Sequence, residues 1–481
     1  MATLCIRRLC IPLEPILSMF MILQLAHHHT MTAFGVSEEI YASITDIPLQ
    51  GVGQGNGAGP GIWSVVNAPI LDMIRNNGGG AVFRTAIGMK LLELVGFSFV
   101  DDDDIVTTDD NVQTPGEDLL EKTQASTDLK NSGLHASGGA LEPQNKVTYN
   151  WRLVDWKKTP TEWVPRSINE MPGDITVYDY SSQERVTIHR QEAFEARECL
   201  GVFISPCGSW KAQTVAISKK LELFGEKLRT SSLSKEETLT ESKGMVWKKM
   251  EYLFPVCGMS RNQWDQALKP LIRAILGSLK TNRNFPREVF YGPKKYQGLG
   301  FIHPYDGQMI TQVTTLIAEG NRGSLTGQMI EASIEQFLVE IGTIAGLNTK
   351  NCRHACHVTT CWVKDIWLYM LEHEMELTYP STIPLACDDD FFIMDKFIQL
   401  NLDTQTIFQL NEIRMHLQLM TFADMCDVQG RFILPQFYDC SGKCWNRKLD
   451  WPRTASPSQA EISLWQESVD RALIGSSSSG T

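Results

Sequence analysis

The spacing of apolar positions along the chain predicts a mixed protein in which short strands precede a long run of helices. Apolar residues from Ile62 to Ile74 recur at spacings of three and four, so we expect a helix that Pro60 can open. Aromatic and aliphatic residues at 94–100 favour a strand, and the run Ile-Val-Thr-Thr at 105–108 favours a second one. These blocks predict a helix followed by a β-hairpin.

Later in the chain the pattern changes from strands to helices. Tryptophans between 151 and 163 and the β-prone runs at 175–178 and 186–188 favour a layer of strands. From Lys219 onward apolar residues instead recur with helical spacing, for example at 330–341. We therefore expect an α+β protein whose C-terminal half is helical.

Four consecutive aspartates, Asp101 to Asp104, occupy the predicted tip of the hairpin. Their charges repel one another at neutral pH, so either water solvates them on a surface turn or cations neutralise some of them. A calcium loop with alternating acids fits poorly, because the glycine and the distal glutamate are absent from the required offsets. Phe97 and Phe99 precede the acids and favour a carboxylate site beside a core, while a solvated turn remains the alternative.

A second motif lies upstream, where residues 54–60 read Gln-Gly-Asn-Gly-Ala-Gly-Pro. Glycines let the backbone approach a ligand closely. The loop matches neither the phosphate loop that ends in Gly-Lys-Ser/Thr nor a dinucleotide loop that follows a strand. By itself it is therefore a weak indication of a binding site.

Taken in order, these motifs resemble the palm of retroelement-encoded reverse transcriptases. That family has a glycine-rich loop that opens a helix and, some tens of residues later, a strand that ends in Phe-Val-Asp-Asp, as at 54–60 and 99–102 here. Residues 138–141 with Lys146 resemble the next palm motif, and Cys-Leu-Gly-Val at 199–202 resembles the hairpin that holds the primer end. The match runs over most of the chain.

The resemblance implies a nucleotidyltransferase, an RNA-directed DNA polymerase of a retrotransposon that uses two Mg²⁺ or Mn²⁺ ions. Its partners would be an RNA or DNA template, a DNA primer and deoxynucleotides. Asp101 would be the shared metal ligand, and Asp102 would be a weaker ligand or a carboxylate just outside direct coordination. Lys146 would protonate the departing pyrophosphate.

The resemblance also implies residues that contact template, primer and nucleotide. Gln54 and Gly55 would lie near the template base and the incoming nucleotide. Phe99 and Val100 would pack beside the primer terminus. Leu200 and Gly201 would belong to the primer-holding hairpin.

One expected family motif is missing from these residues. Such polymerases take a further metal-binding aspartate from a strand before the glycine loop, but the first 34 residues contain a single acid, Glu14, between two prolines. Asp103 and Asp104 leave the hairpin on the other strand and are not expected to replace it. We therefore expect a truncated reverse transcriptase domain that is weakly active or inactive. The alternative is a non-catalytic nucleic-acid-binding remnant.

The net charge of −12 over 481 residues argues against a nucleic-acid partner, but its distribution weakens that objection. Residues 211–300 carry 12 Lys and 5 Arg against 8 acidic residues, a local balance of +9. This basic segment follows the palm, where a thumb would grip a duplex backbone. Lysines on solvated helix faces are the alternative interpretation.

We expect an α+β fold of four parts: a short helical remnant, a partial right-hand polymerase palm, a helical thumb and a helical C-terminal region. A palm-side helical remnant covers 1–34, and the partial reverse transcriptase palm covers 35–210. The thumb-like basic helical region covers 211–345. A C-terminal helical region with a flexible tail covers 346–481, and its apolar positions from 407 to 420 predict one helix.

The 12 cysteines are scattered and are expected to be reduced. One cluster superficially resembles a zinc knuckle but lacks the Cys-x-x-Cys opening and the glycines at its turns. Reduced cysteines on a helix are the favoured interpretation, and structural zinc is the alternative. The cluster consists of Cys352, His354, Cys356, His357 and Cys361.

The sequence also predicts where the protein acts. Arg7 and Arg8 precede an apolar stretch, but prolines interrupt it and no clear small-residue cleavage site follows. No other run of about 20 apolar residues predicts a membrane span. We expect an intracellular protein, nuclear or cytoplasmic, that is not secreted and has no membrane partner; its protein partners are unknown.

Overall fold

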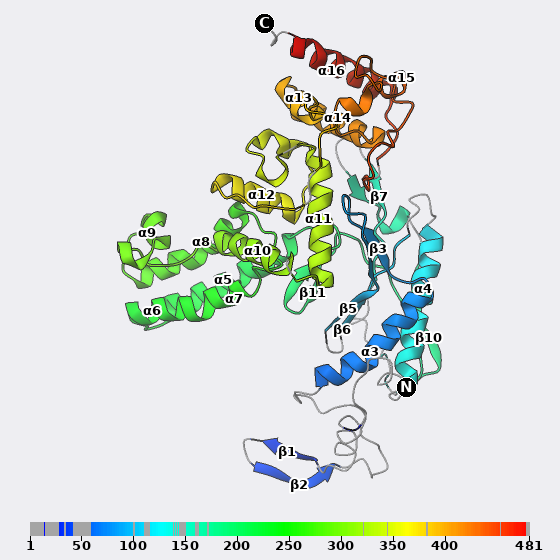
Figure 1. Ribbon diagram of the computed structural model, residues 1–481. Helices are drawn as coiled ribbons and strands as arrows, with labels where there is room; N and C mark the ends of the chain where they lie inside the picture. The colour runs from blue at the N-terminus through cyan, green and yellow to red at the C-terminus, as the bar shows by residue number, and fades with distance from the viewer. Residues whose placement is uncertain are drawn as a thin grey trace. The chain divides into compact units, whose positions relative to one another are not determined.

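The computed structural model of the chain is shown in Figure 1. It describes Glu14 and residues 28–32, 35–41, 59–99, 102–109, 116–137, 139, 141, 143, 151–158, 163–170, 173–320, 322–343, 345–380, 383–452 and 454–477. Two compact units are present. The first comprises Met1–Val82 and Glu93–Glu195, and the second comprises Phe83–Leu92 and Ala196–Thr481.

The predicted α+β class is confirmed, because helices occur together with small antiparallel sheets. Each sheet in the described part of the chain has two strands. In the predicted N-terminal remnant, Glu14 is helical. The following hairpin pairs β1 (His28–Thr32) with β2 (Gly35–Tyr41).

The first unit contains the helix predicted after the glycine-rich loop. Helix α3 (Gly59–Asn76) buries Ile70 and Ile74 at 1% and 0% exposure, as the spacing of its apolar residues required. It packs against α4 (Gly116–Ala136), and Figure 1 shows the two helices side by side. This helix pair is the support on which the acidic hairpin rests.

Short strands follow α3 as predicted, but the second strand of the acidic hairpin lies at 102–105 and not at 105–108. β3 (Ala81–Arg84) pairs with β4 (Leu91–Leu94), and β5 (Gly96–Phe99) pairs with β6 (Asp102–Ile105). The tryptophan-rich layer contains β7 (Trp156–Lys158), β8 (Trp163–Pro165), η1 (Ile168–Glu170), β9 (Ile175–Asp179) and β10 (Glu184–Ile188).

Helix α4 covers one edge of the β9–β10 hairpin through side-chain amides. Gln124 accepts a hydrogen bond from the Thr176 backbone N–H at 2.8 Å and donates to its carbonyl at 2.7 Å. Asn131 donates to the Tyr178 carbonyl at 2.7 Å. These bonds satisfy an edge strand that would otherwise expose unpaired backbone groups.

The second unit continues from a hairpin into helices. The hairpin pairs β11 (Arg197–Cys199) with β12 (Val202–Ile204). The helices that follow it are α5 (Lys211–Thr230), α6 (Lys235–Glu241), the π-helix η2 (Ser242–Trp247), α7 (Lys248–Glu251), α8 (Arg261–Ser278), α9 (Arg287–Tyr291) and η3 (Lys294–Tyr296).

Helices α5 and α8 pack along their lengths and enclose the first large core of this unit (Figure 1). Trp264, Leu268 and Leu271 of α8 are fully buried. Ser260 and Gln263 form a reciprocal capping box that fixes where α8 starts. Burial of so many apolar side chains stabilises these helices more than their intrinsic propensity does.

The C-terminal part of the second unit is helical as expected. Its helices are α10 (Pro304–Gly320), α11 (Leu325–Ile341), η4 (Gly346–Asn348), η5 (Cys352–Cys356), α12 (Trp362–Glu372), α13 (Ile393–Gln399), α14 (Thr404–Leu417), η6 (Ala423–Met425), α15 (Pro435–Tyr438) and α16 (Gln459–Ser477).

The helix predicted at 407–420 ends three residues earlier than its apolar pattern suggested. Helix α14 ends at Leu417, because Gln418 adopts a left-handed conformation with φ of 61°. Met420 is still fully buried, but outside the helix. A buried apolar position with helical spacing therefore need not belong to the helix.

Within the described part of the chain, no helix is both long enough and apolar enough to cross a membrane.

Candidate active site and nucleic-acid interface

The structure describes only some of the residues predicted for the active site. Leu200 and Gly201 are fully described, whereas Phe99 and Asp102 are described only as strand residues, without their side chains. The remaining predicted residues lie outside the described part of the chain. They are Gln54, Gly55, Val100, Asp101 and Lys146.

The predicted acidic hairpin is present, but its second strand begins at Asp102 and not at Ile105 as the sequence suggested. Phe99 pairs with Asp102, and Ser98 pairs with Asp103. Only two positions, 100 and 101, separate the paired strands in the sequence. The other three aspartates belong to strand β6 rather than to a solvated turn, and β6 begins at Asp102. The hairpin thus brings two predicted site residues, Phe99 and Asp102, onto neighbouring strands.

Asp103 lies in a polar cluster that faces helices α3 and α4. Its Oδ1 accepts a hydrogen bond from Asn67 Nδ2 at 2.8 Å, and its Oδ2 forms an ion pair with Lys130 Nζ at 2.5 Å. The side chains of Asp103 and Lys130 are only 11% and 6% exposed. Both carboxylate oxygens are therefore engaged by the protein.

Asn67 connects the rest of this cluster. Its Oδ1 accepts a hydrogen bond from Lys130, and its Nδ2 also donates to Ser98 Oγ at 2.9 Å. Trp63 donates to the same hydroxyl at 3.3 Å, and the Lys130 ammonium lies 5.8 Å from the centre of the Trp63 ring. Two helices and two strands are thus joined by one hydrogen-bond network.

Sequence reasoning identified neither Asn67 nor Lys130 as part of the site. A signal was present, because side chains alternate between the two faces of a strand and an acidic strand packed on helices must turn one carboxylate inward. Helix α4 contains two lysines: Lys130 pairs with Asp103 of the hairpin, and Lys122 pairs with Asp109, shortly after the hairpin. Charge pairing between the hairpin and the next helix could therefore have been predicted.

The second predicted site segment is the tight β11–β12 hairpin. Leu200 and Gly201 form its two-residue turn with φ of 50° and 82°. Positive φ at both central positions is typical of the type I′ turn, which favours Asn and Gly and disfavours Leu. Tyr252 of the segment after α7 donates to the Leu200 carbonyl at 2.8 Å. The Leu200 side chain is 43% exposed although it is apolar.

The basic segment predicted from composition forms an exposed cationic surface on the helices after this hairpin. Within the described part of the chain, most of its lysines form no ion pair; an exception is Lys248, which pairs with Glu251 at 2.6 Å. Such a surface attracts phosphate-rich partners by long-range electrostatics. The exposed lysines are Lys211, Lys219, Lys220, Lys227, Lys235, Lys248, Lys249, Lys269, Lys280, Lys294 and Lys295.

The Cys/His cluster near residue 355 is built around buried histidines that bond to the protein. His354 Nε2 lies 3.1 Å from Asp395 Oδ1, and His357 Nε2 donates to the Ile341 carbonyl at 3.1 Å. Burial, and secondarily the charge of His354, lowers the pKa of His357 to about 3. Helix α12 follows Cys361 and buries an apolar face.

All ten cysteines that the structure describes are free thiols. Among the described side chains, no group of three or more His, Cys, Asp or Glu residues could hold a metal ion. The side chains of Asp101 and Asp102 are not among those described. The predicted Mg²⁺ or Mn²⁺ site therefore stays a prediction.

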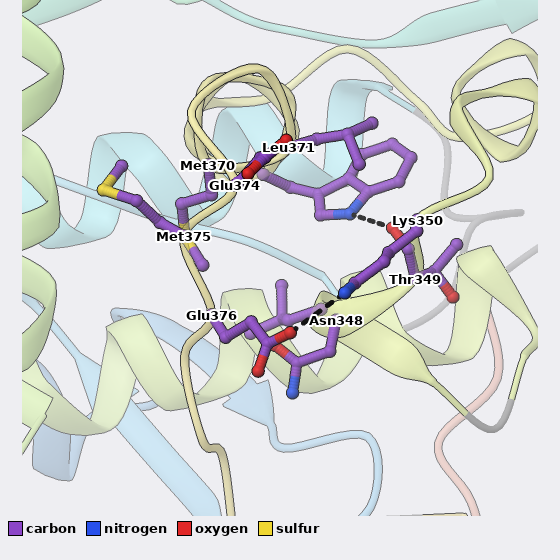
Figure 2. A pocket seen from close by; sticks show the side chains of 10 residues that line it. Asn348, Thr349, Lys350, Met370, Leu371, Glu374, Met375 and Glu376 are labelled. Carbon is purple, nitrogen blue, oxygen red and sulfur yellow. Dashed lines mark hydrogen bonds and ion pairs between the residues drawn. The ribbon is translucent and has the colours of Figure 1, made fainter.

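A cavity of about 460 Å³ lies in the second unit between η4 and α12 (Figure 2). Figure 2 shows Lys350 and Glu376 facing each other across one side, at an N···O distance of 3.2 Å. Trp367 donates to the Thr349 carbonyl at 3.3 Å, so its indole is fixed in the wall. None of the predicted site residues lines this cavity.

Comparison with known proteins adds no further assignment: no protein-family model, curated protein or solved structure matches the chain.

Proposed function

We propose that this chain is a reverse transcriptase domain protein of a mobile element, with a partial polymerase palm and a thumb-like helical region. The proposal rests on the order of its motifs: the glycine-rich loop that opens α3, the acidic hairpin, and the tight Leu200–Gly201 turn before the basic helices. Its reaction is template-directed nucleotidyl transfer to a DNA primer.

The observation that carries the proposal is the register of the β5–β6 hairpin. Because Phe99 pairs with Asp102, the antiparallel ladder of β5 and β6 ends at the two residues that flank positions 100 and 101 in the sequence. A carboxylate at or next to the end of such a ladder can approach a primer end and an incoming nucleotide, whereas a carboxylate further along it, such as that of Asp103, is held beside its neighbours. The buried cluster around Asp103 anchors the strand that leaves this tip.

The donor set at the tip fits divalent cations of the magnesium type, which prefer carboxylate oxygens. Asp101 and Asp102 would hold the ions, while Asp103 is engaged by Asn67 and Lys130. When bound, two ions activate the primer hydroxyl and neutralise the departing pyrophosphate. Lys146 is proposed to supply the proton to that leaving group.

We expect the 481-residue polypeptide to synthesise DNA weakly or not at all. A two-metal site needs carboxylates from more than one strand to hold the ions against their mutual repulsion. The only acid among the first 34 residues, Glu14, lies between Pro12 and Pro15 and not at the end of an apolar strand.

Primer extension on an RNA template tests both parts of this proposal. The chain is compared with Asp101→Ala and with Asp104→Ala, a matched variant at an exposed acid of the same hairpin. Weak extension that Asp101→Ala removes and Asp104→Ala retains supports the assignment. Robust synthesis that depends on Asp101 contradicts the low activity, and synthesis indifferent to Asp101 contradicts the site.

A second function, nucleic-acid binding without catalysis, is favoured by the cationic surface of the second unit. Residues 211–300 carry a balance of +9 in a chain of net charge −12. Binding to a primer–template duplex should weaken steeply with salt, with a slope of about −0.9 per phosphate contact. Replacing Lys248, Lys249, Lys294 and Lys295 by Gln should make that slope shallower, and no binding at low salt would contradict this function.

A further inference from the structure

Two lysines of the second unit lie close together without a carboxylate between them. Lys243 belongs to the π-helix η2, and Lys294 opens η3. Burial lowers the pKa of Lys243, and the charge of Lys294 lowers it further. Within the described part of the chain, no acidic side chain forms an ion pair with either ammonium. Such a cation pair is electrostatically unfavourable until an anion joins it.

Lys243 is held in this position by the surrounding protein. Its ammonium donates to the Leu299 carbonyl at 2.5 Å and lies 4.8 Å from the centre of the Phe301 ring. One of its three N–H donors is therefore used, and two remain for a ligand. A lysine on a solvated helix face would show neither the contact with a carbonyl nor partial burial.

Gly300 lies between the two lysines and leaves the space beside them free of a side chain. Its φ is 70°, and a Cβ there would lie 2.9 Å from Lys294 Cγ and 3.5 Å from Lys243 Nζ. Gly300 donates to the Gly292 carbonyl at 2.8 Å, and Leu299 donates to the Val289 carbonyl at 2.9 Å. The turn is therefore fixed against α9, and a side chain at 300 would fill the space beside both cations.

An exposed aromatic ring follows Lys294 in the same short helix. Tyr296 ends η3 and is 73% exposed, and Lys295 Nζ lies 4.7 Å from its ring centre. An aromatic ring left in solvent beside cations is the combination that binds single-stranded nucleic acids, because phosphates bind the ammoniums and a base stacks on the ring. Bases inside a duplex cannot stack on a side chain without leaving their neighbours.

We propose that Lys243, Lys294 and Tyr296 form a binding site for single-stranded nucleic acid, in which the two lysines share a phosphate and Tyr296 stacks on a base. The choice of nucleic acid as the ligand rests on the proposed function, since a polymerase or its non-catalytic remnant binds a template strand. It does not depend on the acidic hairpin or on catalysis.

The test measures binding of the full chain to a fluorescent single strand of about 20 nucleotides and to the matching duplex at several salt concentrations. The double variant Lys243→Gln/Lys294→Gln should bind the single strand at least about 10-fold more weakly, and its salt slope should be shallower by about 0.7 for each phosphate that is no longer neutralised. Tyr296→Ala should weaken single-strand binding about 5- to 100-fold and leave the salt slope unchanged.

Two controls separate loss of the site from a general loss of charge or of folding. Lys443→Gln/Lys448→Gln removes the same charge from exposed positions outside the basic segment and should bind as the unmodified chain does. Lys243→Arg keeps the charge and the donor to the Leu299 carbonyl, so it should retain most of the binding. Circular dichroism of each variant verifies folding.

Several results would overturn the site. Equal affinities of the Lys243/Lys294 and Lys443/Lys448 double variants would contradict phosphate binding by Lys243 and Lys294. Unchanged binding in Tyr296→Ala would contradict the stacking of a base on Tyr296. Poly-glutamate binding with the same dependence on Tyr296 would replace nucleic acid by an acidic protein. Primer extension reports on the polymerase separately, because a chain without synthesis can still show these differences in binding.

Discussion

Different forces stabilise the two regions: a polar network holds the acidic hairpin to α3 and α4, and apolar packing joins α5 to α8. Around the hairpin, Asp103, Lys130 and Asn67 form a buried polar network between two helices and two short strands. Between α5 and α8, apolar side chains such as Trp264 and Leu268 are fully buried. Apolar packing tolerates substitution by residues of similar volume, whereas a polar network requires every partner. The comparison predicts how much stability each region loses when a single group is removed, and by which mechanism.

The largest effect is expected in the apolar core. Trp264 is fully buried in α8, so Trp264→Ala should destabilise the second unit by about 3–5 kcal/mol through reduced burial and the cavity left behind. Trp445 is 80% exposed and provides the control, since Trp445→Ala should change stability by less than about 0.5 kcal/mol. Hydrogen exchange of α5 and α8 peptides, read by mass spectrometry, measures both. Similar protection in the two variants would contradict the assigned core.

The next effect concerns the polar network. Lys130→Met should destabilise the first unit by about 3 kcal/mol, because the Asp103 carboxylate stays buried without its cation. Lys130→Met/Asp103→Asn removes both charges and should recover at least half of that stability. Hydrogen exchange of α3 and α4 peptides provides the measurement. Equal destabilisation in the single and double variants would mean that the ion pair is not the source of the cost.

A third prediction tests whether the second unit also contains a pH-sensitive polar group. The pKa of buried His357 falls to about 3 from its ordinary value of 6.5, so the unfolded chain binds a proton that the folded chain does not. The stabilisation is complete above pH 6.5 and is lost as the pH falls toward 3. At a pH one unit below the ordinary value, the loss should be about 1.4 kcal/mol.

Denaturant titrations at about pH 7.5 and about pH 5.5 measure that loss. His357→Gln keeps a donor for the Ile341 carbonyl but does not titrate, so its stability should depend less on pH. An unchanged pH dependence in His357→Gln would assign the effect to other groups.

The smallest effect is expected at the tight β11–β12 turn. Leu200 adopts φ of 50°, which costs an L-residue with a bulky side chain about 1–2 kcal/mol. Leu200→Asn should therefore raise stability by about 0.5–1 kcal/mol, because Asn suits this turn position. Thermal unfolding measures the gain, with Leu233→Asn at an exposed loop position as the control. A loss of stability at position 200 would show that the Leu side chain contributes contacts that outweigh its backbone strain.

The sequence predicted much of the secondary structure for a physical reason. The helix after the glycine-rich loop, the acidic hairpin, the tryptophan-rich strands and α11 all follow local periodicity, which depends only on neighbouring residues. The prediction was wrong for the second strand of the acidic hairpin, which begins at Asp102 and not at Ile105. It was also wrong at the end of α14, where Met420 kept the helical spacing although Gln418 had already ended the helix. Burial of a residue therefore does not show that the residue belongs to the neighbouring helix.

The sequence by itself determined the α+β class, the order of the motifs and the segment that carries the positive charge. The tertiary structure alone decided which charges meet: Lys130 with Asp103, and Lys243 beside Lys294. These pairs join residues separated by 27 and 51 positions, and no local pattern specifies the contact between them. Local preferences act over a few residues, whereas the pairing of buried charges depends on how whole helices and strands pack.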